Sequence, residues 1–275
     1  MNVVDLTELV RAPAALTVPG DVLAGGAGGP AAAVSSVCLY WAGMALNDYA
    51  DRAVDAGERP RRPIPSGRVA PNAALALAAG LTGAGLAAAA VTGGRRRLAL
   101  ALPLAVTVWA YDLRFKGTAV GPVVMAAARV QDVLLGGGAR ALLPALAIGV
   151  HTCGVTVLSR GEVRGTDGVP AYVALAATAV AAVLAARPVR SEPLGRRAAR
   201  LCLAAAYAGS VGWAQTRAAR RRDPVTVRAA VGAGICGLLP LQAAFTAAQG
   251  RTATAAALAA IHPVARLLSR KVSPT

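Results

Sequence analysis

The sequence predicts an all-α fold, a polytopic transmembrane helical bundle of about nine helices. Of its 275 residues 56% are hydrophobic and only 15% are charged, whereas soluble domains carry about 25% charged residues. The apolar residues form blocks of roughly 17 to 22, the length that crosses a bilayer core. Much of the apolar content is alanine and glycine, which let helices approach closely in a membrane. We therefore expect one compact domain over residues 1–275.

The expected spans follow one another along the whole chain. They are residues 12–29, 30–46, 72–92, 97–113, 118–138, 141–158, 170–186, 199–216 and 229–249. A further stretch, 252–268, is expected to form a tenth span or a helix at the membrane surface. The first eight residues hold two acids and no base, so a cleavable signal peptide is not expected and the first span would act as the insertion signal.

The net charge of +16 does not indicate a nucleic-acid partner. The basic residues lie mainly in short connections between apolar blocks, with few aromatic side chains for base stacking. By the positive-inside rule, the loops at 47–70, 114–117, 159–169 and 217–228 are expected to be cytoplasmic. We expect a multi-pass protein of the inner (cytoplasmic) membrane. The four cysteines lie far apart within apolar blocks and predict buried thiols rather than disulfides.

The strongest chemical signal is the polar stretch NDYADRAVDAGERPRRPIPSGRV at residues 47–69. Asn47, Asp51 and Asp55 are spaced four apart and Asp48 precedes Asp55 by seven, so a helix brings all four side chains to one face. Carboxylates this close repel one another unless a cation lies between them. Oxygen ligands of this charge favour Mg²⁺, which shares its remaining positions with substrate phosphates.

Arginines and prolines follow this acidic face. Arg59, Arg61 and Arg62 supply forked donors that match phosphate geometry. The prolines at 60, 63 and 65 end the helix, and Ser66-Gly67 turns the chain toward the next span. The alternatives are a solvated loop with surface ion pairs or basic residues that hold lipid head groups. The regular spacing of the acids favours a metal-bridged diphosphate instead.

This stretch closely resembles the first aspartate motif of the UbiA-type membrane prenyltransferases, N-D-x-x-D-x-x-x-D followed by R-P-x-x-P-[IL]-x-S-G. Asn47, Asp48, Asp51 and Asp55 match the family's Mg²⁺-diphosphate ligands position by position. The resemblance implies a bundle whose site opens at the cytoplasmic helix ends and sideways to lipid. It also implies transfer of an isoprenyl group from its diphosphate to an acceptor, with Asp51 and Asp55 as catalytic residues and Arg59 and Arg62 as diphosphate ligands.

The segment YDLRFKG at 111–117 resembles a second family segment, Y-x-x-x-[LF]-K-G. By this resemblance Lys116 is a catalytic donor to the diphosphate, and Tyr111 lines the prenyl pocket or contacts the diphosphate. The alternative is a snorkelling lysine and an interfacial tyrosine. Arg11, ahead of the first span, resembles an arginine that faces the family's site, and the alternative is a topological anchor.

The family's second aspartate motif is expected near residues 151–165, HTCGVTVLSRGEVRG, and this chain departs from it. Glu162 is the only acid in the segment and the expected metal ligand there, while Asp167 lies two residues beyond its end. Arg160 and Arg164 would instead contact the diphosphate directly. Two interpretations stay open: a catalyst that relies more on arginine, or a relative that binds a prenyl diphosphate or lipid without transferring it.

Other polar groups lie within apolar blocks. Arg129 and Asp132 are three residues apart, and we expect them to form an ion pair that supports the cavity, with Gln131 beside them. His151 is expected to form a hydrogen bond within the bundle.

The sequence thus predicts a membrane prenyltransferase that uses Mg²⁺ and an isoprenyl diphosphate. Its acceptor would be small and aromatic or lipid-like. The alternative is a non-catalytic binder or carrier of a prenylated or lipid intermediate. Solute transport is disfavoured because the acids cluster at span ends rather than near the midplane of broken helices.

Overall fold

The computed structural model describes residues 3–11, 17–26 and 29–271, and this part of the chain is helical without a strand. The all-α prediction is confirmed. The α-helices are α1 (Val3–Leu9), α2 (Val18–Gly25), α3 (Gly29–Glu58), α4 (Pro71–Ala110), α5 (Gly121–Gly137), α6 (Leu142–Ser159), α7 (Val169–Ala186), α8 (Leu194–Arg221), α9 (Pro224–Ala248) and α10 (Thr252–Lys271). A π-helix, Tyr111–Phe115, follows α4, and a 3₁₀ turn, Gly138–Ala141, joins α5 to α6.

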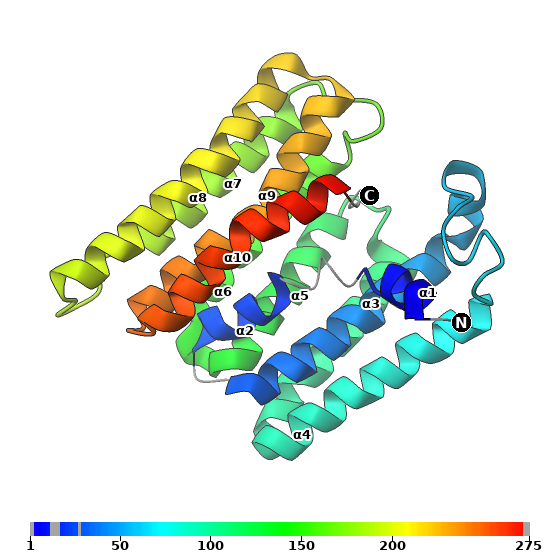
Figure 1. Cartoon of the computed structure of the whole chain (residues 1–275), viewed down its shortest axis with the longest axis horizontal. Helices are drawn as coiled ribbons and strands as arrows, with labels where there is room; N and C mark the ends of the chain where they lie inside the picture. The colour runs from blue at the N-terminus through cyan, green and yellow to red at the C-terminus, as the bar shows by residue number, and fades with distance from the viewer. Residues whose placement is uncertain (1–2, 12–16, 27–28, 272–275) are drawn as a thin grey trace.

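The first expected span, 12–29, is only partly covered, because residues 12–16 and 27–28 lie outside the described residues. Within its described part, the eight residues of α2 are helical. Figure 1 shows α3 and α5 to α10 side by side, with their ends gathered at two opposite edges of the bundle. The polar loops 59–70 and 160–168 lie toward the same edge, so residues far apart in sequence meet there.

Helix α4 holds two of the expected spans, 72–92 and 97–113, and turns back on itself between them. The turn lies at Gly94, where φ is 58° and ψ is −155°, a conformation that glycine adopts without a steric penalty. The two arms are antiparallel neighbours, since the Trp109 indole N–H donates to the Thr82 hydroxyl over 3.0 Å. The second arm returns to the edge from which the first began, and it brings Tyr111–Phe115 back to α3.

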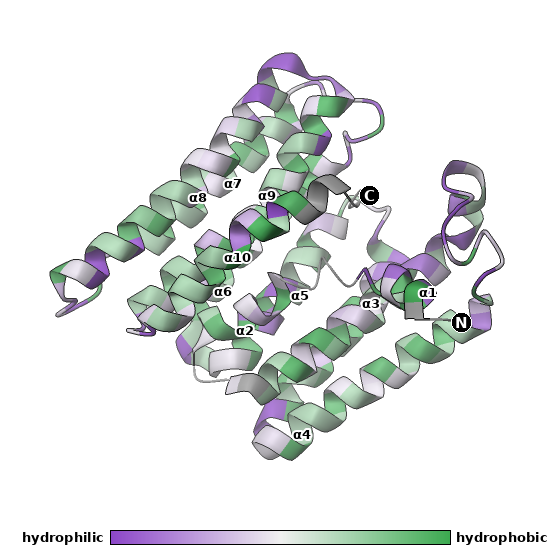
Figure 2. Cartoon of the chain, in the orientation of Figure 1, coloured by the Kyte–Doolittle hydropathy of each residue, from purple (hydrophilic) through white to green (hydrophobic). Residues whose placement is uncertain are grey.

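Within the described part of the chain, four stretches are long and apolar enough to cross a membrane, by length and composition: Pro71–Phe115, Gly121–Ser159, Val169–Ala186 and Pro224–Ala248. Figure 2 shows apolar residues along the middle of the helices and polar residues at the two edges of the bundle. Such an apolar belt between polar ends is what a bilayer of about 30 Å selects.

Glycines bring α2 and α5 into backbone contact. A Cβ atom at Gly25 would lie 2.1 Å from the Val133 carbonyl oxygen, and one at Gly136 would lie 2.1 Å from the Val22 carbonyl oxygen. Only glycine permits this approach, as is typical of helix pairs in membranes. The short helix α2 is therefore embedded among α3, α5 and α9.

Candidate functional site

The last turns of α3 carry the acidic face that the sequence predicted. The helix continues unbroken to Glu58, so Asn47, Asp48, Asp51 and Asp55 all lie on it. Asn47, Asp48 and Asp55 are buried, with 7%, 4% and 2% of their surfaces exposed. These side chains therefore point into the protein rather than into solvent, unlike an ordinary charged loop.

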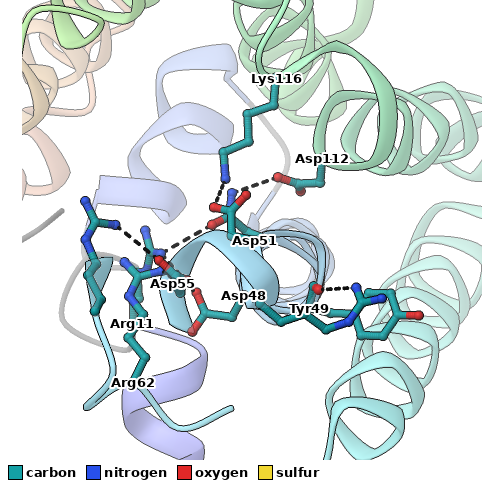
Figure 3. A network of polar contacts seen from close by, with 11 residues as sticks. Arg11, Asp48, Tyr49, Asp51, Asp55, Arg62, Asp112 and Lys116 are labelled. Atoms are coloured by element: carbon teal, nitrogen blue, oxygen red, sulfur yellow. Dashed lines mark hydrogen bonds and ion pairs between the residues drawn. The ribbon is translucent and has the colours of Figure 1, made fainter. Parts of the chain in front are cut away.

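Two arginines approach the acids from one side of α3 (Figure 3). Arg62 Nη1 lies 3.1 Å from Asp48 Oδ1 and 2.8 Å from Asp55 Oδ2. Arg11 Nη2 lies 3.0 Å from Asp48 Oδ1 and 3.3 Å from Asn47 Oδ1. Arg11 has a φ of 47°, an uncommon conformation for a residue with a side chain, and such strain concentrates at functional sites.

The loop after α3 is folded tightly enough to return Arg62 to the acids. The amide of Arg62 donates to the Arg59 carbonyl, and the amide of Val69 donates to the Pro63 carbonyl, each over 3.0 Å. Gly67 supplies the left-handed turn, with φ at 76°. The prolines thus end the helix as predicted, and Arg59 remains near it, with Nη1 3.8 Å from Asp55 Oδ1.

A second group reaches α3 from the other side, from the π-helix Tyr111–Phe115 (Figure 3). The wider turn is closed by the Lys116 amide, which donates to the Tyr111 carbonyl over 2.8 Å. Lys116 Nζ forms an ion pair with Asp51. Asn47 Nδ2 donates to Asp112 Oδ1 over 2.9 Å. Single π-turns of this kind are frequent at functional sites.

Asp112 is a site residue that the sequence prediction missed. It is buried beside Asn47 and lies within electrostatic reach of Lys116, Asp51 and Arg11. The sequence feature that could have identified Asp112 is its position as an acid next to Tyr111 at the end of an apolar span, where ionisable groups are costly. Tyr111 is half-buried and lies within electrostatic reach of Asp51, Asp112 and Arg160.

The loop that follows α6 contributes arginines and one acid. Arg160 donates to the Thr118 carbonyl, which ties this loop to the segment just after Lys116. Arg228 Nη1 donates to the Glu162 carbonyl over 2.8 Å. Burial raises the pKa of the Glu162 carboxyl to about 7, against the opposing effect of the Arg59 and Arg228 guanidinium groups. Through Arg59, this loop faces the same acids as the first.

The donor set suits a cation that is shared with a phosphate ligand. Among the described residues, no three Asp, Glu, His or Cys side chains converge closely enough to hold a metal ion on their own. Mg²⁺ needs only one or two protein carboxylates when phosphate oxygens and waters complete its octahedron. The oxygens of Asn47, Asp48, Asp51 and Asp55 meet that need. The adjacent arginines and Lys116 supply donors for the phosphate oxygens.

The interior polar groups differ from the expected pairing. Arg129 forms its ion pair with Asp21 of α2 rather than with Asp132, which accepts a hydrogen bond from Ser36. The i, i+3 spacing suggested a local partner, but the packing of α2 against α5 supplies a partner from far away in the sequence. His151 does bond within the bundle: Tyr207 Oη lies 2.7 Å from Nδ1, and Nε2 donates to the Gly234 carbonyl over 3.0 Å.

Known proteins resemble this chain over its first half and in its fold. The model of the UbiA prenyltransferase family matches residues 15–158. Digeranylgeranylglyceryl phosphate synthase of Methanopyrus kandleri is 40% identical over 134 residues, which cover 48% of this chain and 49% of that protein. The protein of that name from Methanothrix thermoacetophila is 34% identical over 160 residues, 58% of this chain and 60% of the relative. The match thus spans 49% and 60% of the length of these two relatives.

Two solved structures share the fold. One, described as giving structural and mechanistic insights into the biosynthesis of digeranylgeranylglyceryl phosphate synthase in membranes, has a TM-score of 0.62 at 17% identity and covers 90% of this chain and 98% of its own. A UbiA homolog from Archaeoglobus fulgidus bound to GPP and Mg²⁺ has a TM-score of 0.61 at 13% identity, with coverages of 85% and 99%. The family model covers more than half of the chain, and so this integral membrane protein belongs to the UbiA prenyltransferase family.

Proposed function

We propose that the chain transfers an isoprenyl group from an isoprenyl diphosphate to a hydroxyl group of a lipid-like acceptor. The observation that carries this proposal is the alternation of buried and half-buried acids with cations at one edge of the bundle. Each of three acids contacts a cation. Asp48 contacts Arg11 and Arg62, Asp51 contacts Lys116, and Asp55 contacts Arg62. A diphosphate with a divalent cation can exchange with these ion pairs, because its oxygens take the cations and its metal takes the acids.

In the proposed reaction the allylic C–O bond to the diphosphate breaks and a bond forms from the same carbon to the acceptor oxygen. The departing pyrophosphate takes up the proton that the acceptor hydroxyl loses. Lys116, Arg62 and Arg11 donate to the diphosphate oxygens, where negative charge grows as the bond breaks. Asn47, Asp48, Asp51 and Asp55 would hold Mg²⁺, which when bound supplies Lewis-acid stabilisation of that charge. The apolar helices keep water from the allylic cation.

For the acceptor we propose a glyceryl phosphate that bears a prenyl chain, rather than an aromatic ring. Two relatives at 34% and 40% identity are named digeranylgeranylglyceryl phosphate synthase. A phosphate on the acceptor needs cations beyond those that receive the diphosphate. Arg160, Arg164 and Arg228 lie on or beside the second loop, where Glu162 is the nearby acid. The site-bearing edge is proposed to face the cytoplasm, in the inner membrane, from the distribution of basic loops.

The test incubates the purified chain with prenyl diphosphates of several lengths and a prenylated glyceryl phosphate, with and without Mg²⁺. We expect Mg²⁺-dependent release of pyrophosphate and formation of the ether product. The double variant Asp51→Ala/Asp55→Ala is expected to lose both, and an exposed control, Arg52→Ala, is expected to retain them. Full activity in the double variant would contradict the proposal.

The same assay separates the alternative of a non-catalytic binder. A binder would retain the prenyl diphosphate without releasing pyrophosphate for any acceptor. Turnover with an aromatic acceptor but not with the glyceryl phosphate would keep the transferase and reject the lipid acceptor.

A further inference from the structure

A second polar cluster lies inside the bundle, away from the candidate site. It consists of Asp21 on α2, Ser36 on α3, Arg129 and Asp132 on α5, and Gln242 on α9. Asp21 and Gln242 are fully buried, and Asp132 exposes 6% of its surface. Ser36 precedes Asn47 by eleven residues on α3, which corresponds to about 16 Å along a helix. The cluster is therefore deeper in the bundle than the acids of the site.

Asp21 receives strong donors. It forms an ion pair with Arg129, and Gln242 Nε2 donates to its Oδ1 over 2.7 Å. A charged and a neutral donor on one carboxylate favour its ionised form.

Asp132 has a different environment. Its Oδ2 accepts from the Ser36 hydroxyl over 2.8 Å, while its buried Oδ1 has no donor. The carboxyl groups of Asp132 and Asp21 nevertheless lie close enough to interact with each other. Two ionised carboxylates that interact in a buried site repel each other, which favours a proton on one of them.

The charge of the cluster leads to the same conclusion. Two ionised carboxylates and one guanidinium would leave one negative charge uncompensated in an apolar interior, which is costly. A metal ion would need more oxygen ligands than two carboxylates. The remaining amide oxygen, Gln242 Oε1, faces Gly20, where a Cβ atom would lie 2.0 Å away. A proton satisfies the charge with the groups that are present.

We propose that Asp21 and Asp132 share one proton, which Asp132 carries and donates to Asp21, and that this neutral cluster anchors the start of α2, the helix that follows Arg11 in the sequence. Gln242 Nε2 also donates to the Thr17 carbonyl over 2.8 Å, so the cluster fixes the start of α2. Arg11 lies six residues before Thr17 in the sequence. The assignment of the proton does not depend on the proposed function, whereas the consequence for diphosphate binding rests on the proposed function.

The proton is tested by infrared spectroscopy of the whole purified chain at neutral pH. A protonated-carboxyl band is expected in the native protein. It should lose one component in Asp132→Asn, while the exposed control Asp167→Asn leaves it unchanged. If the Asp132→Asn spectrum equals that of the native protein, the proposal is overturned.

Stability provides a second measurement. Asn at position 132 reproduces a protonated carboxyl, because its amide can donate to Asp21 and its oxygen can accept from Ser36. We expect an unchanged midpoint of thermal unfolding in Asp132→Asn. In Asp21→Asn the Arg129 guanidinium loses its anion, and the midpoint should fall by about 5 °C or more, or the variant should fail to fold. Equal destabilisation by the two substitutions would overturn the assignment, as would a Na⁺-specific stabilisation that Asp132→Asn abolishes.

The consequence for the site is measured by titration with inorganic pyrophosphate and Mg²⁺. Asp132→Asn should bind as the native protein does, and Arg129→Met, which frees the Asp21 anchor, should bind several-fold more weakly. Equal binding by native protein and Arg129→Met would reject the positioning role but leave the proton. A native protein that binds no pyrophosphate would instead contradict the proposed function.

Discussion

The two polar loops at the site-bearing edge of the bundle differ in how their charges are arranged. At the first, acids on α3 alternate with Arg11, Arg62 and Lys116, so that each sign has a partner. At the second, Glu162 lies within electrostatic reach of Arg59 and Arg228, and its carboxyl makes no ion pair within 4.0 Å among the described residues. We therefore propose that the first loop receives an anion together with a cation, and that the second receives an anion alone.

Removal of the Lys116 charge from the first loop is expected to have the largest effect, a loss of pyrophosphate release. Lys116→Met frees Asp51 and removes a donor to the leaving diphosphate, and pyrophosphate release should fall about 10²- to 10³-fold. Arg114→Met, an exposed change on the same π-helix, is the matched control and should retain activity. Equal losses in both variants would show that the segment, and not the Lys116 charge, matters.

Loss of Arg62 should weaken the charge pairing of the first loop, because Asp48 then keeps only Arg11 and Asp55 keeps only Arg59, at 3.8 Å. In Arg62→Met, Asp48 and Asp55 lose the guanidinium that bridges them. The free energy of unfolding should fall by about 3 kcal/mol, because buried carboxylates lose a charged partner. Chemical denaturation in detergent measures this, with the exposed neighbour Arg61→Met as control. A stability like that of the control would mean that water compensates these acids.

Loss of Arg160 tests the second loop as an anion receptor. In Arg160→Gln the affinity for the phosphate-bearing acceptor should fall roughly tenfold, the value of one charge-assisted hydrogen bond. The Mg²⁺ dependence should remain as in the native protein, since the first loop is intact. Titration calorimetry compares this variant with the control Arg220→Gln, an exposed position at the end of α8, and a changed Mg²⁺ dependence would contradict separate roles for the loops.

The smallest effect is expected from Glu162 and depends on pH. Because burial raises its pKa to about 7, its contribution to stability is fully present below its ordinary pKa and is lost as pH rises through 7. Metal-free Glu162→Gln should therefore unfold at the same temperature as native protein at pH 5, and at a slightly higher temperature at pH 8. Asp167→Asn serves as control. A native protein that is the more stable of the two at pH 8 would refute the unpaired state of Glu162.

The sequence was most informative where function depends on local spacing. Asn47, Asp51 and Asp55 are four residues apart, and Asp48 precedes Asp55 by seven. A helix is enough to bring these side chains to one face, and α3 is that helix. Partners across the bundle could not be inferred in this way. The Asp21–Arg129 pair spans 108 positions and depends on glycine contacts between α2 and α5. Asp112 was missed because its role depends on the path of the second arm of α4.

The π-turn at Tyr111–Phe115 determines the direction, around the helix axis, in which Lys116 points. The turn holds one residue more than an α-helical turn. Deletion of Leu113 would restore α-helical winding and rotate the residues after it by about 100° relative to α3. The ammonium group would then face away from Asp51 while the apolar length of the span hardly changed. Loss of a single codon is therefore expected to separate the proposed role of Lys116 from insertion of the span into the membrane.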